Sequence, residues 1–346
     1  MILVEKLERG YFMELRNWVW TQADEDLAEK WMGNLPDKMI DVHAHIYRMC
    51  DLGKQFTPYV DGPDVAGHDM WKECVERFVG KGKELSAIHV APPCETSKEI
   101  PASNKFVLDE VKKNPDCKAL VLVSPDMTRE QVETYLEDPN VVGMKPFSYY
   151  ANYDGPSGDA PLETYLPEWA WQCAHDHGLM FLVHLMRTGS LADPLNYETI
   201  RAMAKKYPNA RLMLDHCARG FNVETVAAGI EYVKDLPNVY FDTSSICEVM
   251  PMYTVLKHGG LDRVVFGTDF PLTQMRGRSL TIGDGFIWLN GSNVDWESYS
   301  GLVEPVQLGI ENIRALQQTM EVMNLSTAQK EDIFYNNAMA MISGRK

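Results

Sequence analysis

The chain has 346 residues, a formal net charge of −16 at pH 7 and 45% hydrophobic residues. This length suits a single α/β barrel, since such barrels routinely exceed about 250 residues. The acidic balance argues against a nucleic-acid partner, which normally requires a basic stripe, and no run approaches the roughly 18 apolar residues of a membrane helix.

The first 37 residues are expected to form a helical extension. An amphipathic helix is predicted around residues 13–31, with tryptophans at positions 18, 20 and 31. These rings suggest packing on the rest of the domain or on a partner subunit. Residues 38–346 are predicted to form the main domain.

Eight short apolar segments, rich in β-branched residues, follow in the main domain, and most end in a polar residue. They are residues 38–43, 86–92, 118–125, 141–145, 179–184, 211–216, 239–243 and 263–269. Several are continuously apolar, as in residues 119–123. Strands of a parallel sheet that is buried on both faces have this pattern.

Helical patterns lie between these segments. Residues 128–131 have the spacing of a capping box, and Gly178 follows the pattern at 169–177 as a stop signal. Eight strands that alternate with helices predict a (β/α)8 TIM barrel. An open doubly wound sheet is disfavoured because no Gly-rich phosphate loop follows the first strand.

Two long loops interrupt this repeat, one after strand 1 at residues 46–67 and one after strand 8 at residues 272–303. Long loops in a compact domain are usually functional lids or disordered segments. Trp288 and Trp296 favour an ordered lid after strand 8. With Phe286, Trp288 either lines an apolar pocket or packs within the lid.

Polar residues at the ends of the predicted strands carry the chemistry. In a barrel, the carboxyl ends of all strands face one mouth. The residues at these ends are His43, His45, Lys145, His184, His216, Asp242 and Asp269. His43 and His45 are one residue apart, so their side chains point to the same side of a strand. Three imidazoles and one carboxylate suit one divalent metal ion, with zinc favoured over manganese or another first-row ion.

Each of these residues also has a structural interpretation. An H-x-H pair arises by chance, a histidine that closes a strand is more often structural than a ligand, and Asp269 can simply form a turn. Their joint occurrence at one end of the βα units favours the metal site.

The motifs resemble those of a known family. The chain is similar to the amidohydrolase superfamily, specifically to the amidohydrolase-related (amidohydrolase 2) group that includes the aminocarboxymuconate-semialdehyde decarboxylase-like enzymes. The resemblance runs from about Met39 to residues 335–338. It rests on D-x-H-x-H, on the histidines that end strands 5 and 6, and on G-T-D-F-P at residues 267–271.

The resemblance implies roles for individual residues and a homodimeric enzyme. The metal ligands would be His43, His45, His184 and Asp269, and His216 would lie near the open side of the metal. There His216 would either polarise the substrate or contact a second ion.

These implied roles agree with elementary chemistry. Zinc lowers the pKa of bound water to about 7. Asp269, in contact with both metal and water, is placed to take the proton and return it to a leaving group. His216 is placed to bind a developing oxyanion. Asp242 either orients a histidine or has a structural role.

Four basic residues are candidates for substrate binding, namely Arg48, Lys145, Arg187 and Arg219. The planar fork of arginine suits carboxylates, so a small carboxylate-bearing substrate is expected, with solvated surface arginines as the alternative. Some superfamily members carry a carboxylated lysine on strand 4 that bridges two metals. The G-M-K-P segment around Lys145 more closely resembles the single-metal group and favours a free amine.

Three functions fit these residues. The first is a metal-dependent hydrolase that acts on an ester, lactone or amide bond of a small carboxylate-bearing molecule. The second is a metal-dependent non-oxidative decarboxylase of an aromatic or unsaturated acid, which would use the same ligands. The third is a non-catalytic metal-binding protein, which is disfavoured because binding alone does not require acid–base residues.

Cysteine content and the N-terminus predict the compartment. The seven cysteines are odd in number and form no C-x-x-C pair, which is typical of free thiols. Residues 1–6 lack the basic start and apolar core of a secretory signal. We therefore expect a cytoplasmic protein without a membrane partner.

Overall fold

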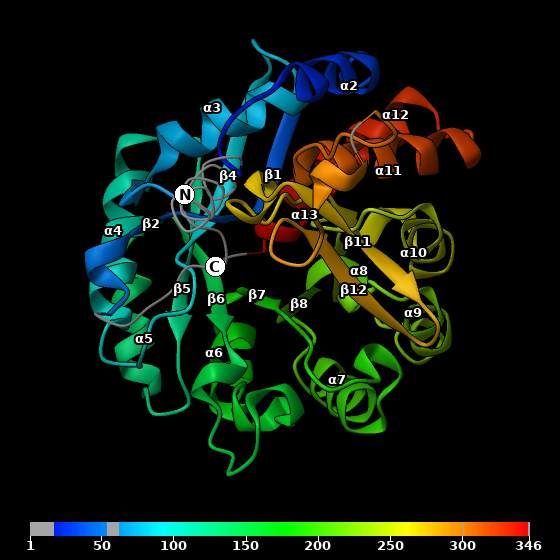
Figure 1. The fold of residues 1–346 in the computed structure, drawn as a ribbon. Helices are drawn as coiled ribbons and strands as arrows, with labels where there is room; N and C mark the ends of the chain where they lie inside the picture. Colours follow the sequence, from blue (N-terminus) through cyan, green and yellow to red (C-terminus); the bar gives the residue numbers. More distant parts are fainter. Residues whose placement is uncertain (1–16, 54–61, 300, 345–346) are drawn as a thin grey trace.

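A ring of eight parallel strands forms the centre of the molecule, with helices around it (Figure 1). The computed structural model describes residues 17–53, 62–299 and 301–344. The strands, in their order around the sheet, are β1 (Lys38–His45), β4 (Glu84–Val90), β5 (Lys118–Val123), β6 (Val141–Pro146), β7 (Met180–Val183), β8 (Arg211–Leu214), β9 (Val239–Asp242) and β10 (Val264–Val265). The predicted (β/α)8 barrel is confirmed.

The barrel closes between β1 and the residues that follow β10. The amide of Val42 donates to the carbonyl of Phe266 at 3.0 Å, and the amide of Asp269 donates to the carbonyl of His43 at 2.7 Å. Strand β10 ends before the predicted position 269 because residues 266–270 bond to β1 instead of continuing the ladder with β9. This closure brings the H-x-H pair next to Asp269.

The outer helices follow the predicted alternation with the strands. They are α3 (His68–Val79), α4 (Ile100–Lys113), α5 (Arg129–Tyr135), α6 (Glu168–His177), α7 (Pro194–Lys206), α9 (Val223–Gly229), α10 (Val249–Thr254), α11 (Leu308–Val322), α12 (Thr327–Glu331) and α13 (Asn337–Ile342). The capping box at Thr128 and Gln131 is confirmed, and Gly178 ends α6 with a left-handed φ of 65°. Within the described residues, no helix is both long and apolar enough to cross a membrane.

Strand β8 is shorter than predicted. It ends at Leu214, two residues before His216, and the chain then enters the short element α8 (Asp215–Arg219). From His216 to Arg219 the backbone is left-handed, with φ between 52° and 60°. Such a conformation costs roughly 1–2 kcal/mol per residue, so surrounding contacts must hold it in place.

The region after β10 is an ordered antiparallel hairpin, in line with the predicted ordered lid. Its strands are β11 (Gly277–Ile282) and β12 (Gly285–Asn290), and Figure 1 shows them beside α9 and α10. The hydroxyl of Thr281 donates to the carbonyl of Phe221 at 3.0 Å. The loop after β1 contains a second, very short pair, β2 (Tyr47–Arg48) and β3 (Val65–Ala66), and residues 54–61 of this loop lie outside the described range.

The N-terminal helix packs on the barrel. Helix α2 (Gln22–Met32) is shorter than predicted, and residues 13–16 of the predicted helix lie outside the described range. It contacts α3 and α11. The buried Asp24 carboxylate accepts from both Nη atoms of Arg276, at 3.1 and 2.7 Å, and from the amide of Gln307 at 2.9 Å. This ion pair joins the extension to the segment that follows β10.

Loss of this buried pair should destabilise the whole fold. We expect Asp24→Ala to lower the free energy of unfolding by about 3–5 kcal/mol, because it leaves a buried guanidinium without its counter-ion. Asp26→Ala, at an exposed position of the same helix, should change it by less than about 0.5 kcal/mol. Urea unfolding of the three proteins measures both values, and equal effects would contradict the structural role of the pair.

Candidate metal centre and active-site cavity

The carboxyl ends of the strands surround a cavity of about 630 Å³, a size typical of small-molecule sites. The strand-end residues predicted from the sequence line this cavity, with the exception of Asp242, which lies behind it. The lining members of that set are His43, His45, Lys145, His184, His216 and Asp269.

The hydrogen bonds of His43 and His45 fix which ring nitrogen carries the proton. Nδ1 of His43 lies 2.9 Å from Oδ2 of Asp242, and Nδ1 of His45 lies 3.2 Å from the carbonyl oxygen of Ala91. Both partners are acceptors, so each Nδ1 donates and each Nε2 keeps its lone pair. Backbone or carboxylate partners of this kind orient metal-ligating histidines.

These two lone pairs converge with one carboxylate oxygen. The Nε2 atoms of His43 and His45 are 3.1 Å apart, and Oδ1 of Asp269 lies 3.4 and 3.5 Å from them. With Asp269 ionised, as beside a cation, three acceptors at these distances have no proton to share. Tetrahedral zinc, with bonds of about 2.0–2.1 Å, places neighbouring nitrogen donors about 3.3 Å apart. The donor set therefore fits a divalent metal ion.

His216 and His184 continue the line of imidazoles across the cavity. Nε2 of His216 lies 3.8 Å from Oδ2 of Asp269, and its ring stacks on that of His43 with 5.3 Å between centroids. His184 follows β7, and its ring meets that of His216 edge-on at 5.0 Å. Its donor atom groups with Asp215 and His216 rather than with the H-x-H pair. The structure thus brings the fourth predicted ligand into the same cavity, beside His216.

Asp242 links His43 to His216 through hydrogen bonds. One of its oxygens accepts from His43, and Oδ1 accepts from the amide of His216 at 2.8 Å and from the hydroxyl of Ser244 at 2.5 Å. The contact with His43 is the orienting contact that the sequence offered as one alternative. The bond to the His216 amide also helps to hold the left-handed turn of α8.

Asp41, the first residue of D-x-H-x-H, joins the two motifs. Its carboxylate accepts from the amides of His43 and Thr268, at 3.1 and 2.9 Å, and from the hydroxyl of Thr268 at 2.6 Å. Trp71 of α3 donates its indole N–H to the same carboxylate at 2.8 Å. One buried side chain therefore fixes the backbone on both sides of the ligand set.

Burial keeps the four cavity histidines neutral. It lowers the pKa of each well below the ordinary value; they are His43, His45, His184 and His216. Neutral imidazole is the form that binds metals. Burial also raises the pKa of Asp269 well above its ordinary value, and a cation bound beside it would reverse this direction.

Lys145 forms a buried ion pair with Asp215 in the wall of the cavity. Both side chains are about 1% exposed, and Nζ of Lys145 donates to Oδ2 of Asp215. Burial raises the pKa of Asp215 to about 7, although the neighbouring Lys145 lowers it. The contact suits the predicted free amine, because a carbamate would place two negative groups together. Gly143 permits the close approach of β6 to β7, since a Cβ there would lie 2.1 Å from the carbonyl oxygen of Met180 on β7.

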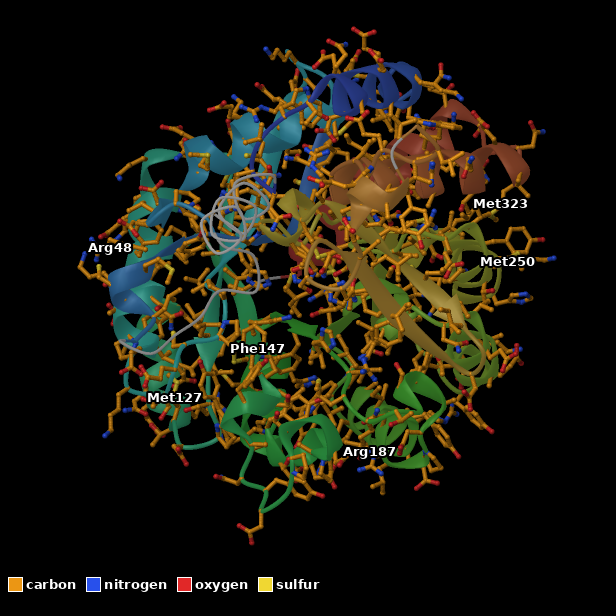
Figure 2. The ribbon with its side chains drawn as sticks, viewed as in Figure 1. Arg48, Met127, Phe147, Arg187, Met250 and Met323 are labelled. Atoms are coloured by element: carbon orange, nitrogen blue, oxygen red, sulfur yellow. The ribbon has the colours of Figure 1, made fainter. Side chains whose placement is uncertain are left out.

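Two predicted substrate-binding arginines lie away from the cavity. Arg48 bonds to Asp51 at 2.7 and 3.1 Å, and Arg187 bonds to Asp193 at 2.9 Å. Neither is among the residues that line the cavity, and Figure 2 shows Arg48 at the outer edge of the molecule. Arg48 and Arg187 are close to His45 and His184 in the sequence but do not reach the cavity, because a nearby carboxylate holds each guanidinium.

Arg219 does line the cavity. One Nη donates to the carbonyl of Arg187 at 2.8 Å, and the guanidinium lies 5.6 Å from the ring centroid of Phe286. Phe286 and Trp288 come from the hairpin and pack on Phe221, with centroids 4.8 and 5.0 Å away. Phe147, which follows β6, also lines the cavity, and Figure 2 shows it toward the middle of the molecule. The cavity thus combines the guanidinium of Arg219 with aromatic walls.

Sequence reasoning missed three supporting residues. Ser244 donates to Asp242 and faces Nδ1 of His216 at 2.8 Å, and Ser245 donates to Oδ2 of Asp269 at 3.0 Å. Both follow β9 directly, so the strand-end criterion that selected Asp242 points to them when extended by three residues. Asp215 follows β8 in the same way, but its ion pair with Lys145 depends on the barrel geometry.

A family comparison agrees with this geometry. The family described as Amidohydrolase (Amidohydro_2) matches residues 40–343, nearly the whole chain. The chain belongs to this amidohydrolase family. It is therefore an enzyme. No curated protein matches its sequence.

Solved structures with the same fold include both hydrolases and decarboxylases. A probable 2-pyrone-4,6-dicarboxylic acid hydrolase from Acinetobacter baumannii, with citric acid bound, is 15% identical over 88% of this chain and 99% of that chain, with a TM-score of 0.58. A 2,6-dihydroxybenzoate decarboxylase from Rhizobium is 13% identical over 89% and 99%, with a TM-score of 0.57. An amidohydrolase from Burkholderia multivorans with bound zinc is 13% identical over 88% and 99%, with a TM-score of 0.56. At these identities the likeness shows a common fold.

Removal of one central ligand should abolish metal binding at this centre. After zinc loading and desalting, we expect His43→Ala to hold one equivalent of zinc per chain less than the unchanged protein, because two donors cannot replace the converging set. His258→Ala, an exposed histidine far along the chain, should hold as much zinc as the unchanged protein. Elemental analysis of folded samples measures the difference, and equal zinc contents would contradict the site.

Proposed function

We propose that this amidohydrolase is a metal-dependent hydrolase that acts on an ester, lactone or amide bond of a small carboxylate-bearing molecule. The observation that carries the proposal is the convergence of His43, His45 and Asp269 at the floor of the cavity. A divalent ion held there, zinc by preference, would supply Lewis acidity toward water and a carbonyl group. His184 supports the proposal as a fourth donor, and a third nitrogen, in the same cavity.

Asp269 is the group proposed to move the proton. Its Oδ1 faces the two histidines, while its Oδ2 accepts from the hydroxyl of Ser245 and faces His216. This arrangement leaves one carboxylate able to hold a proton taken from the attacking water. The same proton can then pass to the leaving group.

His216 is proposed to assist through its Nε2 atom. Its Nδ1 faces the carbonyl oxygen of Ser244 at 3.2 Å, so this nitrogen donates and Nε2 carries the lone pair. Neutral His216 can therefore receive the water proton that Asp269 takes up, across the 3.8 Å between its Nε2 and Oδ2 of Asp269. It can then donate that proton to the oxygen on which negative charge develops.

The substrate carboxylate is proposed to bind Arg219. The background charge of the chain is strongly negative, and the amine of Lys145 is already paired with Asp215. Arg219 supplies positive charge at the wall, and the rings of Phe286 and Phe221 beside it offer stacking for an apolar or aromatic body. These walls support an unsaturated or aromatic acid.

A decarboxylase is the second candidate, favoured by the same aromatic walls. The decarboxylase from Rhizobium with which the chain shares its fold acts, by its name, on 2,6-dihydroxybenzoate. In this alternative the carboxylate that leaves would face the metal ligands, and a cavity acid would protonate the ring carbon. The charged end of the substrate would then point away from Arg219.

A panel of substrates separates the two reactions. Zinc-loaded protein should open lactones, esters or amides of small acids and release acid without carbon dioxide, whereas carbon dioxide from hydroxybenzoates would favour the second candidate.

With the active substrate, Asp269→Asn should lower kcat by about 10²–10⁴-fold. Asp262→Asn, an exposed position, serves as the control. Full turnover by an Asp269→Asn protein that retains its zinc would remove Asp269 from the proposed role.

The carboxylate site has its own test. Arg219→Gln should raise KM for the anionic substrate by roughly 10–100-fold, since one charge-assisted contact contributes about 1.5–3 kcal/mol, with a smaller effect on kcat. It should leave KM for an uncharged analogue of the same substrate nearly unchanged. Arg201→Gln, in an exposed pair with Asp235, provides the matched control. An equal loss for charged and uncharged substrates would contradict carboxylate recognition.

A further inference from the structure

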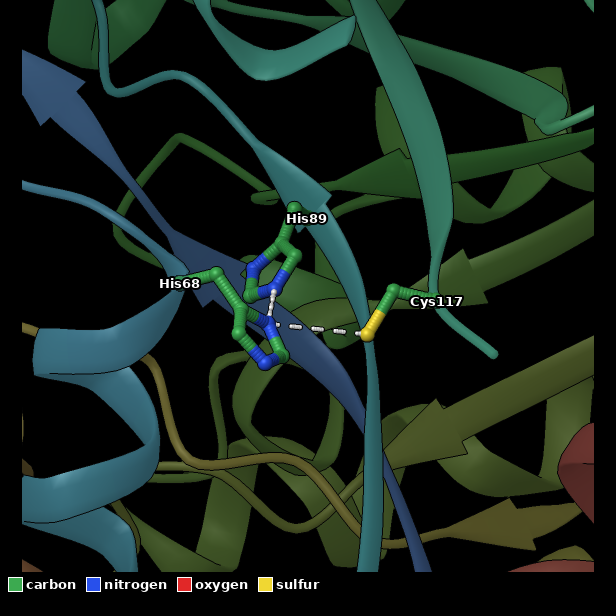
Figure 3. A group of neighbouring side chains, drawn as sticks. All are labelled: His68, His89 and Cys117. Carbon is green, nitrogen blue, oxygen red and sulfur yellow. Dashed lines mark hydrogen bonds between the residues drawn. The ribbon is translucent and has the colours of Figure 1, made fainter. Parts of the chain in front are cut away.

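A second cluster of metal-ligating side chains lies outside the cavity. It consists of His68 at the start of α3, His89 on β4 and Cys117 just before β5 (Figure 3). The three residues are 7%, 0% and 1% exposed. None of them lines the active-site cavity, and the proposed reaction uses none of them.

The donor atoms of this cluster converge on one point. Nδ1 of His68 lies 3.1 Å from Nε2 of His89 and 3.7 Å from Sγ of Cys117 (Figure 3). One donor atom from each residue lies within 4.8 Å of the others. Zinc bonds of about 2.0–2.1 Å to nitrogen and 2.3 Å to sulfur, in tetrahedral geometry, place nitrogen donors about 3.3 Å apart and nitrogen and sulfur about 3.6 Å apart. The observed separations are close to both values.

Hydrogen bonding alone accounts poorly for these contacts. Nδ1 of His68 faces both His89 and Cys117, yet a ring nitrogen has either one lone pair or one proton. One of the two contacts therefore lacks a full partner in every protonation state. A metal ion accepts all three lone pairs at once. Burial lowers the pKa of His68 and lowers that of His89 to about 3, so both rings are neutral and have a lone pair to offer.

The cluster lies on the outer side of the barrel wall, directly behind the candidate catalytic metal ligands. His89 is paired in register with Ala44, which stands between His43 and His45. Its ring meets Trp71 of α3 edge-on at 5.1 Å, and His68 also contacts Trp71 at 5.2 Å. Both histidines therefore point toward the helical layer. The carboxylate of Glu110, which accepts from the amide of His68 at 3.0 Å, adds negative charge beside the cluster.

We propose that His68, His89 and Cys117 form a second, structural metal site that binds a soft first-row ion such as zinc. Two imidazoles and a thiolate are ligands that zinc prefers. Binding replaces the proton of the Cys117 thiol, which is released to solvent, so the thiolate enters the site. The ion ties the start of α3 to β4 and β5. Through Trp71, which bonds to Asp41, it braces the wall that carries the H-x-H pair.

Cobalt substitution tests the site separately from the cavity. Of the two proposed metal sites only this one contains sulfur, so cobalt(II) bound here should give a thiolate-to-cobalt charge-transfer band in the near ultraviolet. A second group with a cysteine, Glu133, Cys173 and His177, lies elsewhere among the described residues, and Cys173→Ala should keep the band. The band should appear in the unchanged protein and in His43→Ala, and should be lost in Cys117→Ala. Cys74→Ala, which removes a different buried cysteine, on α3, should keep the band. His89→Gln, which retains the thiol, should weaken or remove it.

Zinc stoichiometry gives a second readout that does not depend on activity. We expect two equivalents per chain in the unchanged protein, one in Cys117→Ala and one in His43→Ala. If the unchanged protein binds a single equivalent that Cys117→Ala loses and His43→Ala keeps, the cavity site is contradicted and this proposal stands. A reduced, cobalt-saturated protein without a thiolate band, or a band that persists in Cys117→Ala, would overturn the second site. If Cys117→Ala fails to fold, Cys117→Ser and His89→Gln decide the same question.

Discussion

The buried carboxylate of Asp242 is the interaction on which the arrangement of the cavity depends. It is fully removed from solvent, and its two oxygens bind His43, the amide of His216 and both the amide and hydroxyl of Ser244. A buried charge is tolerated only when donors surround it. The same donors set the tautomer of His43 and hold the first residue of a left-handed turn. One carboxylate therefore aligns residues from β1, from α8 and from the segment after β9.

The left-handed run from His216 to Arg219 shows where conformational strain is stored. Four successive residues with L-side chains hold a positive φ, which the barrel compensates through bonds to their backbone. The hydroxyl of Ser190 donates to the carbonyl of Ala218 at 2.6 Å, and Asp242 accepts from the amide of His216. The run places His216 and Arg219 at opposite ends of one turn, both facing the cavity.

The barrel and the convergence of His43, His45 and Asp269 were predictable from the sequence because both follow from short-range rules. Continuous apolar segments identify buried parallel strands, and residue alternation places His43 and His45 on one side. The ring must close for Asp269 to reach them, and eight strands imply that closure. The partners of Arg48 and Lys145 were not predictable. Arg48 meets Asp51 within a tight turn, and Lys145 on β6 meets Asp215, which follows β8. Which carboxylate each cation pairs with therefore depends on the three-dimensional geometry. The expected homodimer and the identity of the metal stay predictions.

The hairpin of β11 and β12 separates substrate selectivity from the reactive chemistry, two properties that are usually coupled. Phe286 and Trp288 form one wall of the cavity, yet they belong to an insertion outside the eight βα units. The candidate metal ligands belong to the barrel itself. Evolution or protein engineering can therefore change the length and aromatic content of this insertion while the reactive centre keeps its shape. New substrates become reachable without re-evolving the chemistry.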